Sequence, residues 1–142
     1  MNADKVLDAL EIAVRETMET MFFSDVAVAA ASDFDSEAFC AEVRFDGCTH
    51  GCFRLAVEKR AAEDLASCLT GPEEDQAPDP AAAVGEIANI ICGSTLSHLY
   101  ADGHISLSSP CLRDGAVPDE SAIRSVFQVD AGLLAAELTW RS

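Results

Sequence analysis

The sequence predicts an α+β fold in which a largely antiparallel sheet packs against two long helices. Two stretches, Lys5–Phe23 and Pro80–Tyr100, place apolar residues at helical spacing. Several short segments alternate between apolar and polar residues, which is the pattern of half-buried strands, and two pairs of them are joined by turn signals, as in hairpins. The chain of 142 residues is long enough for one core, so we expect a single domain over 1–142.

The helix Pro80–Tyr100 is the most apolar element and the one around which the chain is organised. Asp79 suits the N-cap, and a proline suits the first helical position, where its missing N–H costs nothing. Gly103 gives a stop signal. One side of the helix is apolar through Val84, Ile87, Ala88, Ile91 and Leu99. The opposite stripe is narrow and polar or small: Glu86, Asn89, Gly93 and Ser97, bordered by Ile90.

The remaining elements follow from alternation and turn residues. The sequence predicts strands at 39–45, 52–57, 104–109, 121–129 and 133–140, and a short helix at 59–69. Asp46-Gly47 marks the turn of the first hairpin, with a loop of five to six residues. The segments 72–80 and 110–120 are predicted to be loops, and 26–31 is compatible with a strand or a helix end.

The charge of the chain excludes several classes of partner. Its 25 acidic and 9 basic residues give a formal charge of −16, which disfavours binding to nucleic acid or to an anionic membrane surface. No window has the length of a membrane span, and the N-terminus lacks the pattern of a signal peptide. We therefore expect a cytoplasmic protein whose six cysteines are reduced thiols.

The segment Gly85–Gly93, with the sequence GEIANIICG, carries an acid and an amide three residues apart, hence on one helix face. It resembles the signature of the CheC/CheX/FliY phosphatases of bacterial chemotaxis, a helix with Glu-x-x-Asn among small residues. The single copy of the motif, the short chain and the long first helix are most similar to the CheX branch. The resemblance implies a CheC/CheX-like α+β fold with pseudo-duplicated halves.

A short internal similarity in the sequence agrees with such a duplication. Glu11-Ile12-Ala13-Val14 in the first helix is similar to Glu86-Ile87-Ala88-Asn89 in the central one. If this similarity reflects a duplication, Val14 stands where a second asparagine would be, and one site is retained.

The resemblance also implies an activity: hydrolysis of the acyl phosphate on a phosphorylated CheY-like response regulator in chemotaxis or related two-component signalling. Asn89 would position the attacking water, and Glu86 would bind a lysine of the receiver domain. The Mg²⁺ would be held by the receiver, so no cofactor or metal site of the chain's own is expected. The resemblance further implies a homodimer that pairs through sheet edges or faces. Four residues beside the pair are candidates for docking the partner: Gly85, Ile90, Gly93 and Ser97.

The first alternative is a catalytically silent CheX-like binding or dimerisation module. Two departures from the family pattern favour it: Ala82 stands where Asp or Ser is usual, and the proline expected at Leu112 lies at Pro110. Retention of Glu86 and Asn89 favours the enzyme. Another alternative, a small-molecule sensor, would require an apolar cavity.

Other constellations are weaker. Cys48–Cys52, with a cysteine at each end, resembles half a zinc site, but a second pair of ligands would have to come from Cys40, Cys111 or His104. His98 is predicted on the buried side of the central helix, as a packed and hydrogen-bonded histidine. No glycine-rich phosphate loop follows a strand.

Overall fold

The computed structural model describes residues 2–30, 34, 37–70, 79–101, 103–114 and 122–141. Within them the chain forms three helices and seven strands. The helices are α1 (Ala3–Phe22), α2 (Lys59–Thr70) and α3 (Pro80–Leu99). The strands are β1 (Ala27–Ala29), β2 (Ala38–Gly47), β3 (His50–Glu58), β4 (Ile105–Leu107), β5 (Cys111–Asp114), β6 (Ile123–Val129) and β7 (Gly132–Arg141).

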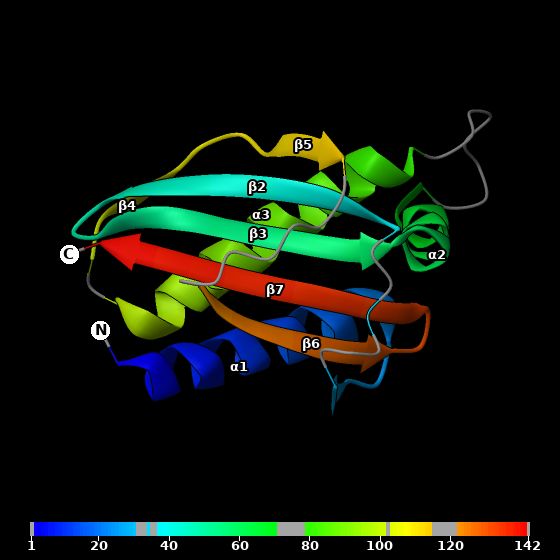
Figure 1. Ribbon diagram of the computed structural model, residues 1–142, viewed down its shortest axis with the longest axis horizontal. Helices are drawn as coiled ribbons and strands as arrows, with labels where there is room; N and C mark the ends of the chain where they lie inside the picture. The colour runs from blue at the N-terminus through cyan, green and yellow to red at the C-terminus, as the bar shows by residue number, and fades with distance from the viewer. Residues whose placement is uncertain are drawn as a thin grey trace.

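All seven strands belong to one sheet, and every pairing in it is antiparallel. The order is β1-β6-β7-β3-β2-β4, and β5 pairs with β2 beside β4. Helices α1 and α3 lie side by side across one face of this sheet, and α2 lies at one end of it (Figure 1). The opposite face, turned towards the viewer in Figure 1, is covered by none of the described helices. This confirms the predicted α+β architecture.

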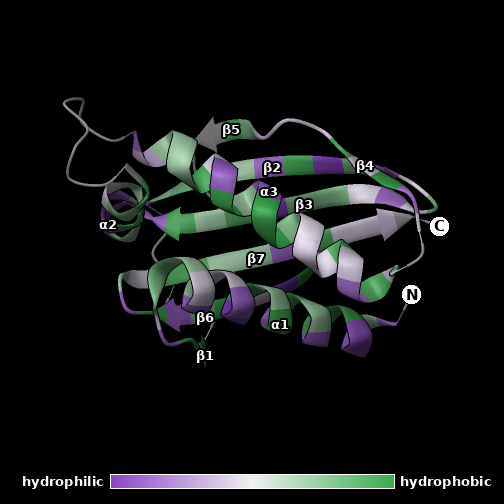
Figure 2. Cartoon of the chain, turned by 180° about the vertical axis from the view of Figure 1, so that it is seen from behind, coloured by the Kyte–Doolittle hydropathy of each residue, from purple (hydrophilic) through white to green (hydrophobic). Residues whose placement is uncertain are grey.

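The core lies between the sheet and helices α1 and α3. Its largest fully buried side chains include Leu10 and Met18 of α1, Ile87 and Ile91 of α3, and Phe53, Leu55, Phe127, Leu134 and Leu138 of the sheet. The predicted inward residues Ala41, Val43 and Phe45 of β2 and Phe53, Leu55 and Val57 of β3 are buried. The alternation is incomplete, because Cys40, Glu42 and Ala56, which point the other way, are buried as well. Figure 2 shows the result from the helix side, where hydrophilic and hydrophobic patches alternate along α1.

The ends of α3 follow the expected capping chemistry only in part. The Asp79 carboxylate accepts hydrogen bonds from the backbone N–H groups of Ala81 and Ala82, at 3.0 and 3.4 Å. At the other end the helix stops at Leu99, and the Tyr100 N–H donates to the Leu96 carbonyl at 2.8 Å. The predicted stop at Gly103 lies farther along the chain, so the helix ends earlier than the glycine signal indicates.

Two predictions about the connections are wrong. The first hairpin turns through only two residues, Cys48 and Thr49, because β2 and β3 extend farther than their apolar alternation. Residues 111–114, predicted as part of a loop, form β5 against β2. Their sequence lacks an alternating pattern, and the pairing with an existing strand decides their conformation. The ambiguous segment 26–31 contains strand β1, and most of the predicted loop 72–80 lies outside the described residues.

The similar segments of α1 and α3 differ in the exposure of their aligned residues. Val14 is fully buried, whereas the aligned Asn89 is exposed. Ile12 is exposed, whereas the aligned Ile87 is fully buried. These differences in exposure do not confirm the pseudo-duplicated halves that the resemblance implies.

Candidate active site on helix α3

The site is the outward stripe of α3. Glu86, Asn89 and Ser97 are exposed, and Ile90 beside them is exposed as well. The inward residues Ile87 and Ile91 are completely buried, as are most others on that side. In Figure 2 this part of α3 appears as a hydrophilic turn followed by a strongly hydrophobic one. An otherwise apolar helix thus presents one acid and one amide to solvent.

Gly85 and Gly93 take different roles in the structure. A Cβ on Gly85 would lie 3.3 Å from Leu112 Cδ2 and 3.3 Å from Pro110 Cγ, which is tighter than ordinary contact. Gly85 is buried beneath these two residues, so its lack of a side chain accommodates the chain's own β5 segment. A Cβ on Gly93 would lie 3.6 Å from Leu107 Cδ1, which is an ordinary contact distance. The missing side chain of Gly93 therefore leaves space on the helix surface beside Glu86 and Asn89.

One flank of the stripe carries two exposed leucines that the sequence did not place there. Leu107 of β4 and Leu112 of β5 are both exposed, and they lie against α3 near Gly93 and Gly85. Local sequence gave no signal for this placement, since it depends on the pairing of β4 and β5 with β2. Together with Ile90, these leucines put exposed apolar surface on both sides of Glu86 and Asn89. We call Ile90, Leu107 and Leu112 the apolar rim.

The other flank is formed by α1 and contains a polar contact. His98 is exposed, contrary to the prediction that it packs on the buried side of the helix. Its Nε2 lies 3.4 Å from Glu16 Oε2 on α1. Its spacing of seven residues from Ile91 does match the core side, but His98 lies in the last turn of α3, where that side is exposed. This residue therefore links the two helices at the surface.

The two side chains of the pair have complementary chemistry. The Asn89 amide can donate and accept hydrogen bonds, and it carries no charge that would repel a phosphoryl group. An ionised Glu86 accepts hydrogen bonds only and attracts a cation. Within the described part of the chain, Glu86 has no ion-pair partner and Asn89 has no hydrogen-bonded side chain, so both are available to another molecule.

Two of the cysteines, Cys52 and Cys92, are thiols whose surroundings disfavour the thiolate. All six cysteines are thiols rather than disulfides. Burial raises the pKa of Cys92 to about 12; burial and then the charge of Glu42 raise that of Cys52 to about 11. Both thiols are protonated at neutral pH and are poor nucleophiles. Among the residues that the structure describes, no three His, Cys, Asp or Glu side chains form a group that could hold a metal ion.

Comparison with known proteins gives this helix its context. A family model described as "Chemotaxis phosphatase CheX" matches residues 39–126, which include all of α3. The chain belongs to the CheX family. The proposed resemblance is thereby confirmed at the level of the family. No curated protein matched the chain.

Solved structures agree with the CheX family in fold. The chemotaxis protein CheX from Desulfovibrio desulfuricans is 18% identical with a TM-score of 0.76, and the match covers 96% of this chain and 99% of that one. CheX from Vibrio vulnificus is 15% identical with a TM-score of 0.78, covering 99% of each chain. A CheX from Borrelia burgdorferi, solved as a complex with CheY, BeF3 and Mg²⁺, is 16% identical with a TM-score of 0.63, covering 98% and 97%. In the described part of this chain, no helix combines the length and the hydrophobicity needed to cross a membrane.

Proposed function

We propose that this protein is a cytoplasmic phosphatase of a phosphorylated CheY-like receiver domain. The observation that carries the proposal is the exposed pair Glu86 and Asn89 on a largely apolar helix, whose other exposed polar residues, Ser97 and His98, lie near its C-terminal end. Membership of the CheX family supports it, because the family is described as a chemotaxis phosphatase. The CheX from Borrelia burgdorferi was solved with CheY, BeF3 and Mg²⁺, which supports a CheY-like partner for this chain.

The proposed reaction is the hydrolysis of an aspartyl phosphate. Water attacks phosphorus, the bond between phosphorus and the aspartate oxygen breaks, and the products are inorganic phosphate and the free carboxylate. Little covalent chemistry is required of the protein, since orientation and charge stabilisation supply most of the acceleration of phosphoryl transfer. The Asn89 amide binds and orients the attacking water opposite the departing oxygen. The Mg²⁺ belongs to the receiver and neutralises the phosphoryl oxygens there.

The test of this function is the lifetime of a phosphorylated receiver from the same organism. Adding the protein should shorten that lifetime, measured as release of inorganic phosphate after the phosphodonor is removed. The competing function is a silent binding module, favoured by Ala82 and the shifted Pro110. A receiver that binds the protein but keeps its normal lifetime would establish the binding module and exclude the enzyme.

Glu86 is proposed to form an ion pair with a lysine of the receiver. Glu86→Lys should weaken binding of a phosphorylated or BeF3-treated receiver by about tenfold or more, because it replaces attraction by repulsion. The loss should be larger at low salt, since exposed charge pairs are screened over about 8–10 Å at physiological ionic strength. Receiver affinity measured at low and high salt, for wild type and variant, tests this. A loss that is independent of salt would assign Glu86 another role.

The apolar rim is proposed to supply contact area around the polar pair. Leu112→Asp should weaken receiver binding by roughly 1–2 kcal/mol, because the leucine is 47% exposed and would be desolvated in the complex. Leu7→Asp on α1 is the matched control, since Leu7 is 38% exposed and lies on another element. Titration calorimetry with both variants checks the prediction. Equal losses from Leu112→Asp and Leu7→Asp would mean that the rim is not the docking surface.

We also propose a two-fold homodimer that joins sheets. Strand β1 lies at one end of the strand order of the described sheet, and Val28 on it is 60% exposed, so this edge offers apolar surface to a second copy. Sedimentation at micromolar concentration should give a dimer for the wild type and a larger monomer fraction for Val28→Asp. A wild-type monomer under these conditions would contradict the proposal, and a dimer unaffected by Val28→Asp would exclude this edge.

A further inference from the structure

The sheet face opposite α3 carries a row of charges across four strands. The cross-strand partners are Glu42 with Arg54, Arg54 with Glu137, and Glu137 with Arg124. Arg44 Nε lies 3.4 Å from Glu42 Oε1, Arg54 Nε lies 3.0 Å from Glu42 Oε2, and Arg124 Nε lies 3.2 Å from Glu137 Oε1. Cations and anions therefore alternate along the row, and the two carboxylates hold the arginines in place.

Glu42 is the centre of the arrangement because it is only 4% exposed and binds two arginines through separate oxygens. Each arginine uses Nε for this contact. The Arg44 side chain is 74% exposed, and no other hydrogen bond of its side chain reaches a described residue. Its two terminal nitrogens can therefore bind an outside anion while the buried carboxylate fixes the orientation of the guanidinium.

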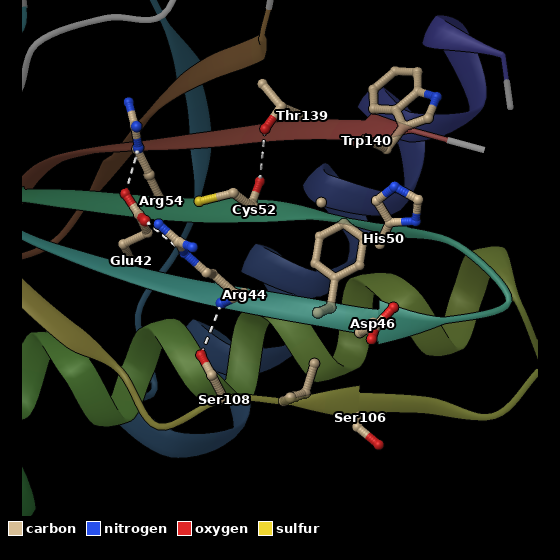
Figure 3. A pocket seen from close by; sticks show the side chains of 13 residues that line it. Glu42, Arg44, Asp46, His50, Cys52, Arg54, Ser106, Ser108, Thr139 and Trp140 are labelled. Carbon is tan, nitrogen blue, oxygen red and sulfur yellow. Dashed lines mark hydrogen bonds and ion pairs between the residues drawn. The ribbon is translucent and has the colours of Figure 1, made fainter.

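A hollow of about 1270 Å³ extends from these arginines along β2, β3, β4 and the end of β7. We call it the outer groove. Figure 3 shows Glu42, Arg44 and Arg54 at one end and His50 and Trp140 at the other. Cys52 and Thr139 lie between the two ends, and Ser106 and Ser108 lie along the opposite wall. The groove thus has one end suited to an anion and one end lined by rings.

The charge of the groove differs from that of the molecule. The chain carries −16 overall, so most of its surface repels anions. In the outer groove, the charges of Glu42 and Asp46 are balanced by those of Arg44 and Arg54. Burial lowers the pKa of Arg54, but the hydrogen bond and charge of Glu42 outweigh this and raise it above its ordinary value, so Arg54 stays charged. An anion that approaches the outer groove therefore meets a region without net charge, in which Arg44 is a highly exposed cation.

We propose that the outer groove binds a small molecule in which a phosphate is joined to a planar ring, the chemistry of a mononucleotide. Guanidinium groups match phosphate oxygens in geometry and charge, and Arg44 and Arg54 line the same end of the groove. The ring lies at the end with His50 and Trp140, where aromatic side chains favour stacking. Asp46 below His50 can accept a hydrogen bond from an amino group on the ring.

The chain contains its own reporter for this proposal, because Trp140 is its only tryptophan. Titration with AMP should change the Trp140 fluorescence in a saturable way. Adenosine, which lacks the anion, and inorganic phosphate, which lacks the ring, should each bind about tenfold more weakly or worse, since each loses one end of the contact. AMP that causes no saturable change, or that binds no better than phosphate, would overturn the proposal.

Variants separate the groove from the rest of the surface. Arg44→Ala should weaken AMP binding by about tenfold, and its exposure means that the fold should tolerate the change. Arg60→Ala is the matched control, because Arg60 is an exposed arginine on α2 outside the groove. Equal affinities of the two variants for AMP would refute the site. Asn89 lies on the other side of the sheet, so the Asn89→Ala variant should bind AMP as the wild type does. The AMP titration and the phosphatase assay therefore test the two proposals independently.

Discussion

Replacing Asn89 by alanine is expected to lower the rate of receiver dephosphorylation by about two orders of magnitude. The amide makes its proposed contact to the attacking water, an interaction that contributes mainly in the transition state. Loss of one positioned polar group at a reacting centre typically costs about 10²–10³ in rate. Because Asn89 is exposed and outside the core, the protein should stay folded and should bind the receiver with nearly normal affinity.

Phosphate release and receiver binding must be measured on the same preparations. Gln128→Ala is a suitable control, because Gln128 is an exposed amide on β6, on another element of the molecule. It should leave both quantities unchanged. If Asn89→Ala loses binding and rate in equal proportion, the amide is a docking group and the water-positioning role is wrong.

Replacing Ile87 by alanine should strongly reduce the stability of the protein. Ile87 is completely buried in the core, between the exposed Glu86 and the core-facing Ala88. The variant should lose about 3 kcal/mol of unfolding free energy, from lost burial and from the cavity left behind. For a domain of this size, Tm should fall by roughly 10 °C. Denaturant unfolding and calorimetry measure both values.

Glu86→Ala, one position away, provides the comparison. It removes a side chain from the exposed face and should change the free energy of unfolding by no more than about 0.5 kcal/mol. Ile87→Ala should therefore affect stability, and Glu86→Ala should affect receiver binding. Comparable destabilisation by the two variants would contradict the assignment of Ile87 to the core and of Glu86 to an exposed functional face of α3.

The elements with a strong periodic pattern could be predicted from the sequence. Helix α3 was predicted within one residue because its apolar side, its N-cap and its first proline agree with one another. Strand β5 could not be predicted, since four residues without alternation become a strand only by pairing with β2. The short turn at Cys48 was missed for a related reason, because ladder pairing extends β2 and β3 beyond their apolar residues.

For the site, the sequence supplied the pair but not its surroundings. Glu86 and Asn89 are three residues apart on one helix, so helical geometry alone places them on one face. Leu107 and Leu112 reach that face through sheet pairings that no local pattern encodes. The row of charges on the opposite face of the sheet also results from strand pairing that no local pattern encodes. Glu42 and Arg54 are neighbours because their strands pair in register, and each looks like an ordinary surface residue in the sequence.

The central claim is that this member of the CheX family turns over a phosphorylated receiver. The most direct measurement is phosphate release from a receiver that is continuously rephosphorylated by a small-molecule donor and present in large molar excess over the protein. The account predicts steady release at a rate proportional to the concentration of the protein, and almost none above background with Asn89→Ala. Release that stays at the receiver's own background rate at every protein concentration would contradict it.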